Sequence, residues 1–285
     1  MTGTRWPGGP FAGRPRWLLP VALGVVVVLA IVGIIVAIVN GVSAVVAGPQ
    51  CTVTAPPNSP GLRSSWSGSP EQMDNAATIA GVGRKLGAPD RAITIALATA
   101  IQESGLANLN GGDRDSLGLF QQRPSQGWGT TAQLTNTVTA TTKFYDALLA
   151  IPGWAGMDVT QAAQRVQRSG YPEAYADHEP EARTLALVFL GQAPGGLTCG
   201  NLDLSAPPEE TVASLASSEL GNARLSGRQT AEAGWSIASW LVAHSTRLAV
   251  DRVTYDGRTW TAASGTWAQT GSADGMLALH RAGTP

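Results

Sequence analysis

Cysteine, histidine and charged residues are all scarce in this 285-residue chain. It has two cysteines and three histidines, 14% of its residues are charged, and its formal net charge is −1. This balance provides no broad basic surface, which argues against nucleic acid as a partner. The histidines, His178, His244 and His280, form no metal-binding pair at helical spacing, and the two cysteines are better used on each other. We therefore expect no metal site and no cofactor.

One long apolar run dominates the N-terminal part of the chain. Residues 17–47 carry no charge and are almost entirely Leu, Val, Ile, Ala and Gly, whereas a helix needs only about 20 such residues to cross a bilayer. A cleaved signal has a shorter apolar core of about 7–15 residues, although Val45-Val46-Ala47 leaves a cleavage site open as an alternative. Because Arg5, Arg14 and Arg16 precede the run, we expect a single-pass cell-membrane protein with a cytoplasmic N-terminus.

Cys51 and Cys199 both follow this run, so they lie on the expected outer side, where disulfides persist. They bracket most of the helical part of the chain. We expect a disulfide between them that clamps the two ends of one domain, worth up to about 5 kcal/mol in the loop-entropy account. Two unpaired thiols are the alternative.

Hydrophobic periodicity predicts a mainly α protein. Apolar residues recur at the helical period, prolines mark the breaks, and residues 106–130 form an irregular lobe. Further on, Gln229 to Leu248 predicts one helix, and Asp256-Gly257 predicts a hairpin turn between short strands. The expected helices of the first domain are 71–86, about 90–104, 135–150, 159–167 and 180–190. The expected parts are a cytoplasmic tail at 1–16, a transmembrane helix at 17–47, a linker at 48–70, a helical domain at 71–200, a linker at 201–215 and a small α+β unit at 216–285.

Two short motifs carry the chemistry. Glu103-Ser104 stands at the end of a helix, and Ser116-Leu117-Gly118-Leu119-Phe120-Gln121 follows a dozen residues later. Together they resemble the soluble lytic transglycosylase family, which has a lysozyme-like fold. The resemblance implies that Glu103 is the acid that cleaves the glycan strand of peptidoglycan. A position in the last helical turn suits a proton donor, because the negative end of the helix dipole disfavours a carboxylate there.

The same resemblance implies a substrate cleft beside Glu103. Ser104 would orient Glu103 or its loop, and Gln121 would contact sugar, with Gln122 and Arg123 as further polar candidates. The family's downstream Ala-Tyr-Asn-Ala-Gly stretch is absent, and a stretch from Gln167 to Tyr175 stands nearest to it, so either of its tyrosines could replace the family's tyrosine. The expected substrate-binding residues are Ser104, Ser116, Gly118, Gln121, Gln122, Tyr171 and Tyr175, although Gly118 could serve turn geometry alone.

A second carboxylate would decide between two reactions. If Asp113 or Asp115 faced Glu103, it could activate water or act as a nucleophile, as in a lysozyme-type hydrolase. The transglycosylase family needs no such partner, because the substrate's own C6 hydroxyl attacks and an anhydro sugar results. Gly111-Gly112-Asp113-Arg114-Asp115 also makes a good turn, in which Arg114 neutralises its neighbours. We prefer this interpretation of the aspartates.

The C-terminal unit resembles an accessory domain found beside cell-wall hydrolases of actinobacteria and akin to a zinc peptidase fold. The segments that carry this resemblance are Ile237 to His244 and Val253 to Trp260. The metal-binding pattern is missing, with His280 alone near the end, so we expect a non-catalytic unit.

Our interpretation is a membrane-anchored peptidoglycan lytic transglycosylase whose partners are glycan strands and the lipid bilayer. The alternatives are a lysozyme-type glycoside hydrolase with a second carboxylate and a non-catalytic peptidoglycan-binding envelope protein.

The expected topology can be tested with reporters fused after Pro285. A reporter that works only outside the cytoplasm should be active there, because the only charges near the apolar run are the arginines before it. A reporter that works only inside should be silent. The opposite pattern would contradict the compartment and, with it, the substrate.

Overall fold

The structure is a computed structural model that describes residue 31, residues 48–168 and residues 173–283. The expected tail at 1–16 lies outside the described residues, and so does the expected membrane segment at 17–47 apart from Ile31. Among the described residues, no helix is long and apolar enough to cross a bilayer. Residues 48–285 form one compact unit, and it alone is considered below.

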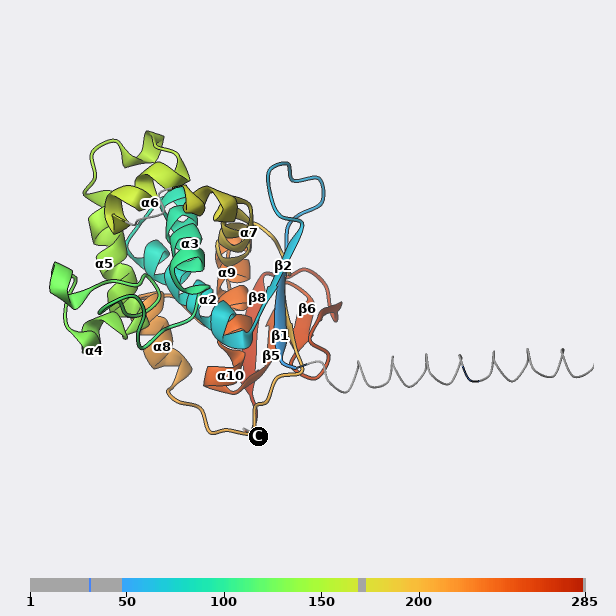
Figure 1. Cartoon of the computed structure of the whole chain (residues 1–285). Helices are drawn as coiled ribbons and strands as arrows, with labels where there is room; N and C mark the ends of the chain where they lie inside the picture. The colour runs from blue at the N-terminus through green and yellow to red at the C-terminus, as the bar shows by residue number, and fades with distance from the viewer. Residues whose placement is uncertain (1–30, 32–47, 169–172, 284–285) are drawn as a thin grey trace, which may run out of the picture. The chain divides into compact units, whose positions relative to one another are not determined.

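The compact unit is mainly helical, with a small sheet region towards the C-terminus (Figure 1). The helices are α2 (Pro70–Lys85), α3 (Asp90–Ser104), α4 (Thr131–Leu134), α5 (Thr137–Leu149), α6 (Val159–Gln167), α7 (Glu179–Phe189), α8 (Val212–Glu219), α9 (Ala231–Ala243) and α10 (Ser245–Leu248). Three 3-10 turns are η1 (Pro124–Gln126), η2 (Trp154–Gly156) and η3 (Ala174–His178). The strands are β1 (Gln50–Thr54), β2 (Ser65–Gly68), β3 (Leu197–Gly200), β4 (Gly227–Arg228), β5 (Val250–Tyr255), β6 (Arg258–Thr261), β7 (Trp267–Gln269) and β8 (Met276–Arg281).

Local sequence signals account for the ends of the two central helices. The Ser69 side chain accepts a hydrogen bond from the Gln72 backbone N–H, and the Gln72 side-chain oxygen accepts one from the Ser69 backbone N–H, a capping box that starts α2. Helix α3 ends at Gly105, whose φ of 62° belongs to the left-handed region in which glycine is favoured. Both helices therefore begin and end close to where the sequence predicts.

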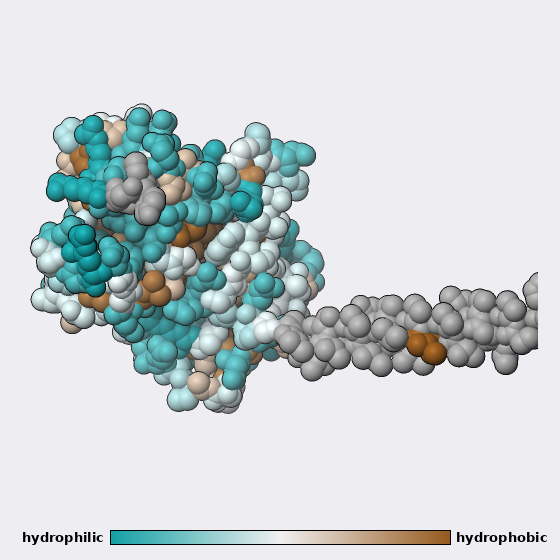
Figure 2. All heavy atoms as spheres, viewed as in Figure 1, coloured by the Kyte–Doolittle hydropathy of each residue, from teal (hydrophilic) through white to brown (hydrophobic). Residues whose placement is uncertain are grey.

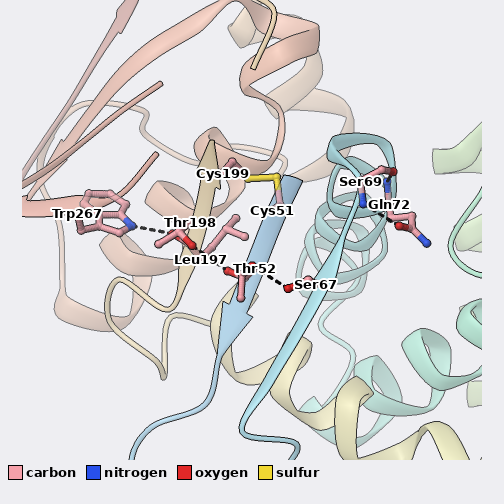
Figure 3. Close-up of a disulfide and its surroundings, with 9 residues drawn as sticks. All are labelled: Cys51, Thr52, Ser67, Ser69, Gln72, Leu197, Thr198, Cys199 and Trp267. Carbon is pink, nitrogen blue, oxygen red and sulfur yellow. Dashed lines mark hydrogen bonds between the residues drawn. A yellow bond between two sulfur atoms is a disulfide. The ribbon is translucent and has the colours of Figure 1, made fainter. Parts of the chain in front are cut away.

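The segment 48–70, expected as a linker, instead contains two strands. Strand β1 is the centre of a three-stranded antiparallel sheet of order β2-β1-β3. Cys51 lies directly opposite Cys199 in this sheet, and the expected disulfide joins them (Figure 3). Cys51 and Val53 alternate with polar residues along β1 and are buried, as in a half-buried strand, but its partner β3 lies beyond the whole helical region in the sequence.

Helix α9 connects the helical region with the C-terminal sheet. It packs against α2 and α7 as well as against β5 (Figure 1). The sheet is antiparallel in the order β4-β8-β5-β6-β7, and its β5–β6 hairpin turns at Asp256-Gly257, as the sequence predicts. The helix expected over 229–248 is divided at His244, which separates α9 from α10. The segment 201–215, expected as a linker, lies within the one compact unit.

Large apolar side chains are rarely exposed on the compact unit. Those exposed are Leu86, Leu109, Leu149 and Met276, and each is only about 40% exposed. The face seen in Figure 2 is mostly hydrophilic, with isolated apolar residues. Single exposed hydrophobic residues are normal on soluble domains and do not mark a docking surface.

A buried charge cluster joins the C-terminal part to α2. The imidazole of His244 is fully buried between two carboxylates: its Nδ1 pairs with Asp74 of α2, and its Nε2 lies 3.0 Å from Glu219 Oε2 of α8. Glu219 is also fully buried and accepts hydrogen bonds from Thr78 Oγ1 at 2.8 Å and Trp240 Nε1 at 2.7 Å. Each buried carboxylate oxygen of Glu219 thus has a partner, as burial of a charge requires.

The cluster keeps His244 protonated. Burial alone would lower the pKa of His244, but the charges of Asp74 and Glu219 outweigh it and raise the pKa to about 10. The same interaction lowers the pKa of the Asp74 carboxyl against its own desolvation. Because the unfolded pKa of histidine is about 6.5, the stabilisation is fully present below about pH 6.5. It is lost as the pH rises towards 10.

We expect His244→Asn to destabilise the protein by about 3–5 kcal/mol at pH 6.5, because it leaves the fully buried Glu219 without its counter-charge, while Asp74 keeps Arg247 at 3.5 Å. The difference from wild type should shrink by pH 9.5. Urea unfolding at the two pH values, followed by circular dichroism, measures both effects.

His280→Asn is the matched control, since His280 pairs with Asp251 at 2.6 Å but is 37% exposed. The loss of folding stability in His280→Asn should stay below about 1 kcal/mol, as is usual for surface ion pairs. Equal losses in the two variants would contradict the role given to burial.

Candidate functional site

Glu103 lies in the last turn of α3, the helix at the centre of the helical region (Figure 1). α3 packs against α2, α5, α6 and α7. The small residues Ala92, Ala96 and Thr99 of α3 are fully buried and serve close helix packing. Glu103 itself is partly exposed. The helix thus fixes a carboxyl at the rim of the core, where a ligand can reach it.

The backbone just after Glu103 is tied to α2. Gln72 Nε2 donates to the Gly105 carbonyl at 2.8 Å, and Asn75 Nδ2 donates to the Leu106 carbonyl at 2.8 Å. These side chains satisfy carbonyl oxygens that a helix end leaves without intrahelical partners. The end of α3 is therefore held by side chains from a neighbouring helix as well as by its own cap.

The second motif forms a tight turn beside this helix end. The backbones of Leu117 and Gln122 bond to each other in both directions at 3.0 Å and enclose Gly118 to Gln121. Gly118 has a φ of 73°, and a Cβ there would lie 2.1 Å from the Leu134 carbonyl oxygen. Glycine is therefore required at this position by backbone geometry alone. Ser104 Oγ donates to the Leu119 carbonyl at 2.8 Å, so the two motifs are directly hydrogen-bonded.

The remaining polar residues of the turn mostly support it. Gln122 is 2% exposed and its Nε2 reaches the Ala140 carbonyl at 3.4 Å, while Ser116 is 6% exposed. Gln121 is partly exposed, and its Nε2 donates to the Gly118 carbonyl at 3.2 Å. Of the three, Gln121 has the surface needed to meet a ligand.

Tyr175 provides the contact that singles out Glu103. Its hydroxyl donates a hydrogen bond of 2.6 Å to Glu103 Oε1, although the two residues are 72 positions apart. The Tyr175 side chain is fully buried on η3. Tyr171, the other tyrosine that the sequence offers, lies outside the described residues. Among the described residues, no hydrogen bond reaches the second carboxyl oxygen of Glu103, Oε2. This oxygen is therefore available to a ligand.

A second contact between η3 and α3 was missed from the sequence. His178 Nε2 lies 2.9 Å from Gln102 Oε1, and His178 Nδ1 lies 2.9 Å from Glu181 Oε1. Arg63 in turn donates to Glu181 Oε2 at 3.0 Å. No local signal in the sequence pairs His178 with Gln102, because the two residues are 76 positions apart. The contacts of His178 hold η3 against α3, and η3 is the segment that carries Tyr175 to Glu103.

The two aspartates lie in the irregular lobe and are occupied differently. Asp115 accepts from Arg123 Nε at 2.7 Å, from the Ser125 N–H at 2.8 Å and from Ser125 Oγ at 3.0 Å. These bonds, with that of the Ser125 backbone the largest, hold the pKa of Asp115 well below its usual range. The Asp113 side chain is 91% exposed and only 3.9 Å from Arg114. Both carboxylates therefore have a local structural explanation.

No cluster of three or more His, Cys, Asp or Glu residues suited to a metal ion occurs in the described part of the chain. No protein-family model matches the chain, and no curated protein matches it in sequence. The functional argument therefore depends on the geometry around Glu103.

We expect Tyr175→Phe to lower the glycan cleavage predicted from the sequence about 2–10-fold, because the hydrogen bond that holds Glu103 Oε1 in place contributes about 0.5–1.5 kcal/mol. The ring is kept, so the helical content should not change. Cleavage rates on purified peptidoglycan measure the loss.

Tyr145→Phe is the matched control, because its buried hydroxyl donates to the Ile79 carbonyl at 3.0 Å within the core. It should cost stability but not turnover. An unchanged rate in Tyr175→Phe would contradict a role for the contact with Glu103.

Proposed function

We propose that this protein is a peptidoglycan lytic transglycosylase with Glu103 as its single catalytic carboxyl. The observation that carries the proposal is the 2.6 Å hydrogen bond from Tyr175 to Glu103 Oε1. Through this bond, a tyrosine from a segment distant in the sequence orients the partly exposed carboxyl of Glu103. We also propose that α2 to α7 form a lysozyme-like fold and that residues 17–47 anchor it to the membrane. The C-terminal sheet then serves as a non-catalytic accessory part.

Glu103 acts first as an acid. Its carboxyl, in the protonated form, donates from Oε2 to the glycosidic oxygen between the muramyl residue and the next sugar, and the bond from that oxygen to the muramyl C1 breaks. Tyr175 keeps Oε1 in place and so leaves Oε2 directed towards the substrate. A fixed donor lowers the reorganisation needed at the moment of bond cleavage.

Glu103 then acts as a base. The carboxylate accepts the proton of the muramyl C6 hydroxyl, whose oxygen bonds to C1 and closes an anhydro ring. The proton given to the leaving sugar is thereby recovered, and no water is consumed. One carboxyl suffices for both steps, which agrees with the local contacts that occupy Asp115.

Glu103→Gln should lower glycan cleavage about 10²–10⁴-fold, the usual contribution of a general acid. Gln keeps the size and a hydrogen-bond acceptor for Tyr175 but cannot donate the proton. Asp113→Asn is the matched control and should retain activity, since its side chain is 91% exposed. Turnover on purified peptidoglycan, with circular dichroism to check folding, measures both variants.

Mass spectrometry of the products separates the alternatives. Anhydro-muramyl ends support the proposal. Reducing muramyl ends, together with loss of activity in Asp113→Asn or Asp115→Asn, would identify a lysozyme-type hydrolase. Binding of peptidoglycan without cleavage by the wild type would favour the non-catalytic envelope protein.

A further inference from the structure

We propose that a cavity between α5, α6 and η1 is a subsite for a carboxylate carried by the muramyl residue of the glycan strand. The carboxylate is one on the peptide stem or, where the stem has been removed, that of the lactyl group. The inference rests on the proposed function, since it names the part of the same substrate that extends past the cleaved bond.

The cavity has a volume of about 550 Å³, enough for a sugar ring with a short substituent. Trp128, Ala147 and Ile151 supply apolar wall, and Gln126, Arg165 and Arg168 supply polar groups. An indole beside polar side chains suits a ligand with one apolar face and several polar atoms. Such a lining favours a substituted sugar over a purely apolar ligand.

The charge of the lining has one sign. None of the described residues that line the cavity is acidic, while Arg165 and Arg168 are both exposed and form no ion pair with a described carboxylate. Guanidinium groups match the geometry of a carboxylate and can bind it through two parallel hydrogen bonds. The cavity is therefore complementary to an anion.

The two arginines stand at the C-terminal end of α6. Arg165 lies in the last turn of the helix, where the helix dipole alone favours a cation. Arg168 follows the helix directly, at its C-cap. Both guanidinium groups therefore come from one end of one helix and line the same cavity.

One turn links the cavity to the acid. Ser104, next to Glu103, donates to the Leu119 carbonyl at 2.8 Å, and Gln167, which lines the cavity, donates to the Phe120 carbonyl at 2.6 Å. Phe120 also stacks on Phe144 of α5, with ring centroids 4.5 Å apart. The residue next to the acid and a residue of the cavity wall thus bond adjacent carbonyl groups of the same turn. This turn is the structural link on which the proposal depends.

The test measures binding to the full-length chain in detergent by calorimetry. The first probe is the GlcNAc-MurNAc disaccharide with a tetrapeptide stem and free carboxylates. The second is the same molecule with every carboxylate amidated, and the third is the stem-free disaccharide with its lactyl carboxylate. None contains the bond that the enzyme cleaves, so binding is read independently of turnover.

The double variant Arg165→Gln with Arg168→Gln should weaken binding of the stem-bearing acid about tenfold or more, as expected for lost charge-assisted hydrogen bonds. Binding of the amidated probe should change less than about twofold. Arg252→Gln, at an exposed arginine on β5, is the matched control and should change neither. The lactyl carboxyl is amide-bonded in the stem-bearing probe and free only in the stem-free disaccharide. A loss on both shows that the subsite also accepts the lactyl carboxylate once the stem has been removed, and no loss on the stem-free disaccharide restricts the subsite to the stem.

Three results would overturn the subsite. They are equal weakening of the acid and amidated probes, no weakening by the double variant, and no measurable binding of the stem-bearing acid to the wild type. A wild type that binds this probe but cleaves no peptidoglycan would instead reject the proposed function and keep the subsite.

Discussion

The first two turns of α2 hold the rest of the structure together. Within one stretch, Gln72 and Asn75 bond the backbone after Glu103, while Asp74 and Thr78 reach the buried His244 and Glu219 pair. The first two side chains point to the end of the acid's helix, and the other two to the C-terminal part. A single helix therefore contacts both the segment that follows Glu103 and the C-terminal part, and so links the two.

Glu103 and the Tyr175 hydroxyl that is hydrogen-bonded to it belong to different elements, α3 and η3. Glu103 is fixed by the core helices, whereas Tyr175 arrives on η3, which is held by His178 through Gln102 and Glu181. The backbone of the acid thus depends on the stability of the core. The direction of its carboxyl depends on a short segment with its own polar contacts. A change on η3 can therefore alter the chemistry without unfolding the protein.

Local patterns in the sequence predict the helices, because caps and left-handed glycines act over a few residues. α2 and α3 begin and end near the predicted positions, and the Asp256-Gly257 turn forms as expected. Strand β1 could not be predicted, because its pairing with β3 closes a separation of 148 residues. The same limit applies to the site. The sequence offers Tyr171 or Tyr175 as a tyrosine for the site. The hydrogen bond from Tyr175 to Glu103 and the burial of Gln122 become visible only in the folded structure.

The disulfide also determines how the compact unit bears mechanical load. Any pull on the chain at Gly48 enters through β1 and meets Cys51 after three residues. From there, the covalent bond to Cys199 carries the force into β3, which is further held through the Leu197 carbonyl by Trp267 (Figure 3). Hydrogen bonds of the strand beyond Cys51 are therefore shielded from tension. A force applied at Gly48 is therefore divided between β1 and β3 at the disulfide and is not carried along β1 alone.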